Sequence, residues 1–429
     1  MDKFRFKRHL NQLEAHYKDA CCEHQEPLAI DLSGWQKLIE QMGKDLQSGK
    51  IKPGDLNQSF IRQTYQEVNK AAGSGYGKDW NKKSMEELPN PMITKMKQNI
   101  YMFSAAKNAA MLLEINERMY DGNRLRTPDE LAAILDGLNI KYNKNWLATE
   151  LITATHSGQM AQKWESIESN RKLFPNLKYK TQGDDRVRPE HEKLDGIIAP
   201  IDSPFWDKYY PPNGPRCRCD AIQTAEPVSR DIPNHVEGVT PVFQNNLGKT
   251  AQIYNEDKYP YFVMSKELPQ FLTNFNASKE FAPIEKVTTP KGNNVDINIF
   301  ARQDSLKDHY ESSVILADQL EQKVIIRPDL KDKTNITLDN KAAELIYPKT
   351  KQSDKHLKDA QEKGAEIVIF NLKNINGAEP DYLHALALSL QDPEQYPGII
   401  QVSIIDQKGY GSLYLRADFV NKYKTGAHE

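Results

Sequence analysis

The residue types best suited to chemistry lie in one irregular stretch of the chain, residues 181–224. A histidine, His191, precedes two cysteines that are separated by one residue, Cys217 and Cys219. Two thiolates and an imidazole are ligands that Zn²⁺ accepts in structural sites. Paired zinc cysteines are usually separated by about two to four residues, so a Cys-x-Cys pair alone does not establish a metal site.

These side chains have three interpretations. The first is a structural zinc site formed by His191, Cys217 and Cys219, with His156 or Asp195 as the fourth ligand. In the second, the histidine and the nearby arginines hydrogen-bond backbone carbonyls of the loop, and the cysteines pack as small apolar side chains. In the third, a cysteine and the histidine form a catalytic pair, which needs a lowered thiolate pKa and a group that orients the imidazole. The sequence leaves all three open.

The stretch that carries these residues is predicted to be an ordered but irregular loop. It is too rich in Pro and Gly for a helix or a strand. Its large side chains, among them Phe205, Trp206, Tyr209 and Tyr210, argue against disorder. A loop of this length that stays ordered in a compact domain is usually functional.

Short motifs follow one another along this loop. They are Arg-x-Arg-Pro-x-His at 186–191, Leu-Asp-Gly at 194–196, Ser-Pro-Phe-Trp at 203–206, Tyr-Pro-Pro-Asn-Gly at 210–214 and Cys-Arg-Cys at 217–219. This order resembles the signature of the phage Mu F-like minor head protein family, whose members act in head morphogenesis. The signature residues that the resemblance gives are Arg186, Arg188, His191, Asp195, Gly196 and Trp206. The chain departs from the family at Pro215–Arg216, where an aromatic residue often precedes the first cysteine.

The resemblance implies a minor capsid protein that acts in procapsid assembly or in DNA packaging or ejection. It implies the portal or the major capsid protein as partner, and a location in the virion or procapsid, assembled in the host bacterial cytoplasm. A DNA-associated ejection protein is the alternative, with phage DNA as partner. The net charge of -2 argues against extensive phosphate contacts.

Composition is consistent with a soluble protein of several domains. The 429 residues suffice for two or three domains of roughly 100–200 residues each. No apolar run reaches the roughly 18 residues of a membrane span, and the first residues lack the apolar core of a secretory signal, so no membrane partner is expected. Four cysteines do not make a disulfide scaffold, which indicates a reducing compartment. Cys21, Cys22 and His24 are interpreted as part of an ordinary N-terminal arm.

The predicted fold class is α+β, with several domains. Residues 1–144 are expected to be mainly helical, because apolar residues recur at helical spacing, notably in a long amphipathic helix over 89–119. Residues 145–270 are expected to form the α+β domain that contains the loop. The polar, patternless segment 271–300 predicts a linker. Residues 301–429 are expected to be a separate α+β domain.

The C-terminal domain alternates predicted helices and strands. Helices are expected over 312–320, 355–364 and 380–390, and strands over 324–327, 367–372 and in two hairpins, 335–346 and 399–415. Asp339–Asn340 suits a type I′ turn in the first hairpin. This layout resembles the tRNase domains of contact-dependent inhibition toxins and the barnase–EndoU–colicin–RelE-like modules.

That second resemblance implies cleavage of tRNA without a metal. Such chemistry needs a base, a cation for the phosphate and a hydroxyl group. The candidates are Lys349, Thr350, His356 and Ser412. A metal-dependent nuclease would use Asp339, Glu344 and a lysine two residues further on; Ile346 stands there, which disfavours that alternative. In the non-enzymatic alternative, the protein is purely structural and this domain is a binding module.

Overall fold

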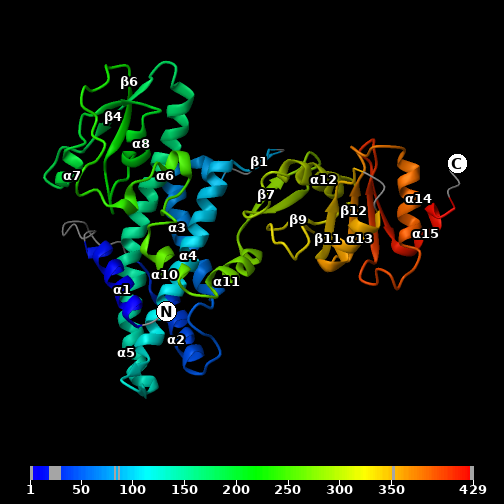
Figure 1. Ribbon diagram of the computed structural model, residues 1–429, viewed down its shortest axis with the longest axis horizontal. Helices are drawn as coiled ribbons and strands as arrows, with labels where there is room; N and C mark the ends of the chain where they lie inside the picture. The colour runs from blue at the N-terminus through cyan, green and yellow to red at the C-terminus, as the bar shows by residue number, and fades with distance from the viewer. Residues whose placement is uncertain (1–2, 19–29, 82–83, 86, 350–352, 426–429) are drawn as a thin grey trace. The chain divides into compact units, whose positions relative to one another are not determined.

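The computed structural model describes residues 3–18, 30–81, 84–85, 87–349 and 353–425, which are traced in Figure 1. They form two compact units. Unit 1 comprises Met1–Lys82 and Pro91–Ser278, and unit 2 comprises Lys83–Asn90 and Lys279–Glu429. The α+β multidomain prediction is confirmed. No described helix is long and apolar enough to cross a bilayer. Cys21, Cys22, His24 and Thr350 lie outside the described residues.

Unit 1 is built around α4 (Pro91–Arg118). The amphipathic helix predicted here is instead buried on all sides, with polar residues such as Asn99, Lys107 and Glu114 among the buried ones. It contacts α2 (Ser33–Gln47), α3 (Gln58–Tyr76), α5 (Pro128–Asn139), α10 (Pro260–Lys266) and α11 (Phe271–Ser278). Because it is enclosed, each of its polar groups needs a partner inside the protein.

Shorter elements complete unit 1. They are α1 (Lys3–Lys18), η1 (Lys78–Asn81), the hairpin β2 (Tyr120–Asp121) and β3 (Arg124–Leu125), η2 (Ile140–Trp146), α7 (Pro189–Glu192), α8 (Pro204–Tyr209), η3 (Pro241–Phe243) and α9 (Leu247–Thr250). Thr127 followed by Pro128 is a sequence signal for the start of a helix, and helix α5 begins there. Thr127 and Glu130 form a capping box, in which each side chain accepts from the other residue's backbone N–H. No domain boundary falls at residue 144, since η2 runs directly into α6 (Leu147–Asn170).

Helices α3 and α6 cross closely because glycines remove the side chains at the crossing. A Cβ built on Gly158 of α6 would lie 2.0 Å from the carbonyl oxygen of Ala72. A Cβ on Gly75 of α3 would lie 1.8 Å from the carbonyl oxygen of Thr155. Both neighbours are backbone atoms, so neither clash can be relieved by moving a side chain.

Gly158→Ala is therefore expected to lower the free energy of unfolding by at least about 3 kcal/mol, the upper end of the usual cost of overpacking. The control is Gly137→Ala in α5, where a new Cβ meets no atom within 4 Å. That substitution is expected to be neutral or to stabilise by about 0.5–1 kcal/mol. Urea denaturation followed by tryptophan fluorescence measures both. Equal stability of the two variants would show that the helices can separate at no cost.

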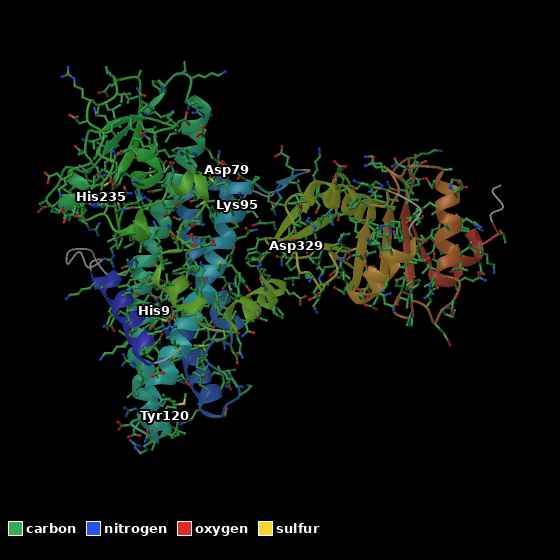
Figure 2. All side chains as sticks on the ribbon, in the orientation of Figure 1. His9, Asp79, Lys95, Tyr120, His235 and Asp329 are labelled. Atoms are coloured by element: carbon green, nitrogen blue, oxygen red, sulfur yellow. The ribbon has the colours of Figure 1, made fainter. Side chains whose placement is uncertain are left out.

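Helix α1 packs against α10 through an aromatic cluster. The ring of His16 stacks on Phe243, with centroids 5.6 Å apart and planes at 9°, and meets Tyr17 and Tyr259 edge to face. Burial lowers the pKa of His16 from 6.5 to about 4. Near the middle of the helix, His9 (labelled in Figure 2) is buried with its Nε2 2.9 Å from Glu267.

The lowered pKa of His16 predicts a loss of stability in acid. The unfolded chain binds the proton near pH 6.5 and the folded chain only near pH 4, so the free energy of unfolding falls as pH drops between these values. Because the ring keeps some solvent contact, we expect a loss of about 2 kcal/mol. Denaturant midpoints at pH 7 and pH 4.5 test this in the wild type and in His16→Gln. An identical pH dependence in both would contradict it.

A small antiparallel sheet in unit 1 supports the irregular loop. Its order is β5 (Ile198–Pro200), β4 (Asn176–Lys180), β6 (Asp220–Thr224). Figure 1 shows it beside one end of α6, with α7 and α8 next to it. Residues 181–197 connect β4 to β5 and residues 201–219 connect β5 to β6, so the motif-bearing segments leave and re-enter one sheet.

Unit 2 is built on a mixed sheet of order β1-β7-β8-β9-β10-β11-β12-β13-β14. The strands are β1 (Ser84–Met85), β7 (Ile284–Thr288), β8 (Asn294–Asn298), β9 (Val324–Ile326), β10 (Ile336–Leu338), β11 (Lys341–Ile346), β12 (Ile367–Asn371), β13 (Gln401–Ile405) and β14 (Gly411–Leu415). The predicted hairpin turn is confirmed, since Asp339 and Asn340 have φ of 47° and 67°.

Helices cover both faces of this sheet. Ile367 and Ile369 of β12 face a core shared with α12 (Leu306–Gln319), whereas Val368 and Phe370 face a core shared with α13 (Ser353–Glu362), α14 (Glu379–Ser389) and α15 (Arg416–Tyr423). This alternation is what a strand buried on both faces requires.

The predicted linker over 271–300 is wrong. These residues form α11, η4 (Lys279–Phe281), β7 and β8. Strands form there because Val287, Val295 and Ile297 reach one buried core, although polar residues between them hide the pattern. The start of the C-terminal unit is therefore at about residue 279, with residues 83–90 added to it.

Candidate metal centre and neighbouring sites

The structure brings His191, Cys217 and Cys219 together in unit 1. Their ligand atoms all lie within 4.8 Å of one another, and they are the only such group of His, Cys, Asp or Glu among the described residues. The Nδ1 atom of His191 is 3.8 Å from Sγ of Cys217 and 3.5 Å from Sγ of Cys219. The three residues are only 3–4% exposed. Both cysteines are free thiols.

Local structure places each of the three ligands. His191 lies on the short helix α7, which Pro189 opens at its first position. Cys219 immediately precedes β6, and its backbone N–H donates to Sγ of Cys217. Arg216, just before the pair, has a φ of 53°, which turns the chain back toward α6, where its Nε donates to Thr149.

The imidazole of His191 is oriented for a ligand at Nδ1. Its Nε2 lies 3.3 Å from the carbonyl oxygen of Asn213, which can only accept a hydrogen bond. Asn213 is fixed in turn by the hydroxyl of Tyr179, which donates to Oδ1 at 3.0 Å. A metal-binding histidine usually donates its second N–H to such a carbonyl. Asn213 lies in the Tyr-Pro-Pro-Asn-Gly motif, but spacing alone did not indicate this role.

The two thiols differ in their tendency to ionise. Burial opposes ionisation of Cys217, but hydrogen bonds with Cys219 and His191 outweigh burial and lower its pKa. The hydrogen bond with Cys217, together with burial, raises the pKa of Cys219. Of the two thiols, Cys217 is therefore the one that loses its proton more readily. An electron-rich pair of this kind suits a soft cation.

The two residues considered as a fourth ligand are engaged elsewhere. His156 places Nε2 2.9 Å from the carbonyl oxygen of Cys219 and Nδ1 3.2 Å from Gln159. The carboxylate of Asp195 accepts from the backbone N–H and the hydroxyl of Thr181. The described residues thus offer three protein ligands, which leaves a fourth coordination position for water or another donor.

The remaining signature residues hold the loop. Arg188 donates to the carbonyl oxygen of Pro215 at 2.7 Å, and Trp206 donates to that of Ala199 at 3.2 Å. Gly196 has a φ of 76°, which glycine adopts without strain.

Charge pairing also stabilises the loop. Arg218 pairs with Asp184 through both guanidinium nitrogens, at 2.7 and 2.6 Å, and its hydrogen bonds lower the pKa of that carboxyl. Arg186, expected to contact a carbonyl, pairs with Asp184 instead. The hydrogen-bonding interpretation therefore holds for Arg188 and His191, and it is compatible with a metal at Nδ1.

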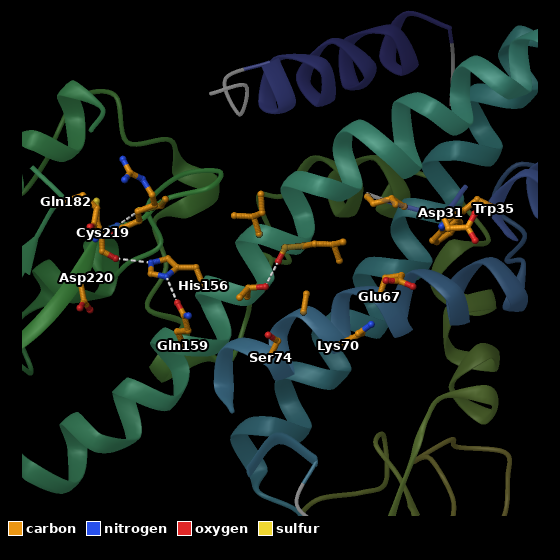
Figure 3. Close-up of a pocket in the computed structure, with 17 residues that line it drawn as sticks. Asp31, Trp35, Glu67, Lys70, Ser74, His156, Gln159, Gln182, Cys219 and Asp220 are labelled. Atoms are coloured by element: carbon orange, nitrogen blue, oxygen red, sulfur yellow. Dashed lines mark hydrogen bonds between the residues drawn. The ribbon is translucent and has the colours of Figure 1, made fainter. Parts of the chain in front are cut away.

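A cleft of about 910 Å³ lies beside the centre (Figure 3). Its walls are α3 and α6, and one end is formed by Cys217, Arg218 and Cys219. Figure 3 shows His156 between Cys219 and Gln159 on that wall. The centre thus adjoins an open cleft on its cysteine side.

The candidate nuclease residues in unit 2 do not form a connected group. Lys349 is exposed, three residues after β11. His356 is half-buried in α13, with burial lowering its pKa, and Ser412 of β14 lies 3.5 Å from the carbonyl oxygen of Ile404. In the described part of unit 2, no hydrogen bond, ion pair or ring contact joins Lys349, His356 and Ser412.

The residues of the metal-dependent alternative are also separated. Asp339 lies in the hairpin turn and accepts from the backbone of Lys323. Glu344 is buried and pairs at 2.5 Å with Lys363, in the turn that follows α13. The lysine that is absent from the strand is therefore supplied by the turn after α13, which spacing along a strand could not reveal.

Comparison with known proteins found one family match, which lies in unit 1. Residues 110–222 match the family described as "Phage Mu protein F like protein". "Putative capsid assembly protein F" of Escherichia phage Mu is 36% identical over 73 residues, 17% of each chain. "Mu-like prophage FluMu F protein" of Haemophilus influenzae is 36% identical over 88 residues, 20% of each chain. The matches span about a fifth or less of these relatives.

One solved structure is similar to part of the chain. It is the CdiA-CT/CdiI toxin and immunity complex from Burkholderia pseudomallei, with 19% identity over 26% of this chain and 85% of that one. Its TM-score is 0.22, a value at which the similarity carries no argument about fold or function.

Proposed function

We propose that this chain is a phage or prophage head protein that acts in head morphogenesis through its Mu F-like region. The observation that carries the proposal is the family match over residues 110–222, which includes the whole His191–Cys217–Cys219 centre. Two Mu-type relatives that are 36% identical, one of them named for capsid assembly, support it. The partner is the portal or the major capsid protein, and the location is the procapsid or virion.

The centre has a structural part in this proposal. A zinc ion held by His191, Cys217 and Cys219 fixes the two ends of a loop that contains few regular elements. In that position the ion adds coordination bonds to the packing that buries Trp206, Tyr209 and Tyr210 in the loop. The low exposure of the three ligands suits this role better than that of a nucleophile, which must reach a substrate.

Complementation tests the function. In a phage or prophage that lacks the chain, wild-type protein supplied from a plasmid is expected to restore DNA-filled heads. The Cys217→Ser/Cys219→Ser variant is expected to restore few, while His235→Asn, a substitution of an exposed histidine in the same unit, is expected to act like wild type (Figure 2). Full head yield without the chain would contradict a role in morphogenesis.

As a second function, we propose that unit 2 cleaves RNA, with tRNA as substrate and without a metal. The sheet topology supports it. Strands β11, β12 and β13 are parallel, so their carboxyl ends lie on the same side of the sheet, and β14 begins on that side. Lys349 follows β11, His356 lies early in α13, and Ser412 opens β14. All three residues therefore belong to the side of the sheet on which β11, β12 and β13 end.

The same topology separates their roles. Three strand spacings of about 4.8 Å lie between β11 and β14, or about 14 Å. We therefore assign the phosphate contact and proton transfer to Lys349 and His356, and substrate binding to Ser412. Thr350 stays a candidate hydroxyl donor on sequence grounds alone.

Purified full-length protein incubated with total tRNA and EDTA tests the second function. Discrete fragments are expected with wild type, and none with Lys349→Ala or His356→Ala. Intact tRNA in every sample would leave unit 2 as a binding module attached to a structural head protein.

A further inference from the structure

Unit 2 contains a polar pocket that neither proposed function uses. Its volume is about 690 Å³. Three segments line it: the approach to α12 and its first turn, the loop from β9 to β10, and a wall formed by Glu344 of β11 and Lys363, which follows α13. Asp329, in the loop after β9, is labelled in Figure 2.

The lining is rich in positive charge. Five cations, Arg302, Arg327, Lys331, Lys333 and Lys363, face three carboxylates, those of Asp304, Asp329 and Glu344. With His309 neutral, the difference is five minus three, or +2.

Two of the three carboxylates are neutralised within the pocket wall. Asp304 accepts from two guanidinium nitrogens of Arg302, at 2.7 and 3.0 Å. Glu344 accepts from Lys363 at 2.5 Å and from the backbone N–H of Asn335 at 3.1 Å. Among the lining carboxylates this leaves Asp329 opposite the cations of the β9–β10 loop. Outside the lining, Glu280 pairs with Arg327, and Asp332 lies between Lys331 and Lys333 in the chain.

The loop that carries these cations is held in place. Arg327 donates to Thr334 at 2.7 Å and to Glu280 at 2.8 Å, and its backbone N–H donates to the carbonyl oxygen of Asn335 at 3.0 Å. Thr334 is fully buried, whereas Lys331 and Lys333 are exposed. The backbone of this loop is therefore already ordered, and binding an anion has to order only the lysine side chains.

A cation is a poorer occupant than an anion. Asn335 pairs with Glu344 across the β10–β11 hairpin, so a neutral amide stands where a second carboxylate would be needed beside Glu344. Among the described residues, the three carboxylates do not form a group close enough to hold a metal ion. Nor does a Phe, Tyr or Trp ring belong to the described lining, which favours contact with a charged backbone over base stacking.

We propose that this pocket binds phosphate groups of a nucleic-acid strand through Lys331 and Lys333, which Arg327 supports by holding the loop to Thr334 and Glu280. The first turn of α12 adds the imidazole of His309, whose Nδ1 is occupied by the carbonyl oxygen of Ser305 at 2.8 Å, so that Nε2 is the atom left for the ligand. The proposal goes beyond the second function, because binding here needs no cleavage.

The test is binding of a labelled 12-nucleotide RNA to full-length protein in EDTA, followed by fluorescence anisotropy at 50–200 mM KCl. Loss of two phosphate contacts in Lys331→Gln/Lys333→Gln is expected to weaken binding about 10- to 30-fold. The slope of the logarithm of the binding constant against the logarithm of the KCl concentration is expected to become less negative by about 1.4. The control, Lys307→Gln/Lys358→Gln, removes the same charge from exposed positions on α12 and α13. It is expected to stay within about twofold of wild type.

Competition by AMP and inorganic phosphate identifies the source of the phosphate. If neither compound displaces the RNA at millimolar concentration, the ligand of the pocket is a nucleic-acid strand. If both displace it from the wild type but not from the Lys331→Gln/Lys333→Gln variant, the ligand is a free phosphate or phosphate ester. Undetectable RNA binding, or equal weakening by the two double substitutions, overturns the proposal. If the RNA stays intact but its binding depends on Lys331 and Lys333, the proposed cleavage by unit 2 is wrong and the proposed binding in the pocket stands.

Discussion

Lys107→Met is expected to lower the free energy of unfolding of unit 1 by about 3–5 kcal/mol, the usual cost of breaking a buried ion pair. Lys107 of α4 and Glu150 of α6 are both fully buried and lie 2.5 Å apart. Lys107 also donates to the carbonyl oxygen of Tyr142 at 2.9 Å. Burial lowers the pKa of Lys107, while the neighbouring Glu150 acts against that shift.

The substitution is costly because it leaves the carboxylate of Glu150 buried without its cation. Glu150 retains hydrogen bonds from the hydroxyls of Tyr17 at 2.6 Å and Tyr261 at 3.4 Å, which cannot replace a charge. Since Tyr17 belongs to α1, the network also anchors the N-terminal helix to the centre of unit 1.

Two further variants separate charge from packing. Lys107→Met/Glu150→Gln removes both charges and keeps a group that can accept from the tyrosines, so we expect it to recover about 2 kcal/mol. Lys95→Met changes an exposed lysine on the same helix (Figure 2) and is expected to cost less than about 0.5 kcal/mol. Urea denaturation measures all three. A double variant that is less stable than Lys107→Met would contradict the unpaired-charge explanation.

Removal of the metal is expected to have the second large effect. Wild-type protein should carry about one equivalent of zinc, and chelation should lower the melting temperature of unit 1 by about 8–16 °C, which corresponds to about 4 kcal/mol of linkage. His191→Asn removes the nitrogen ligand and should lose both the zinc and the response to chelator. Elemental analysis and calorimetry with and without chelator measure these quantities.

His235→Asn is the matched control for this second prediction, because His235 is an exposed histidine of the same unit. It should keep the zinc and the full response to chelator. Metal-free wild-type protein with unchanged stability would show that the loop is held by its hydrogen bonds alone.

Local signals in the sequence were sufficient for many elements. Asp339–Asn340 predicted a turn that needs two positive φ values, and Thr127–Pro128 predicted the start of α5. Such features depend on a few adjacent residues. The strands β7 and β8 were missed because each buries few apolar residues in a polar segment, so their pairing depends on the rest of the sheet.

Contacts between residues far apart in the chain could not be predicted from the sequence. The types of His191, Cys217 and Cys219 indicated the chemistry, but their convergence depends on the β4–β5–β6 sheet and on Asn213. Lys107 gave no sign of burial, since its partner is 43 residues away on another helix. For the same reason the pairing of Lys363 with Glu344 was missed, because α13 has to pack on the sheet before the two can meet.

The most direct test of a role in head morphogenesis is quantitative mass spectrometry of purified procapsids from the phage or prophage that encodes the chain. We expect full-length protein at a constant ratio to the portal protein, and much less of it in procapsids when Cys217 and Cys219 are replaced by serine. Procapsids of normal composition that lack the chain, with all of it free in the lysate, would contradict the account.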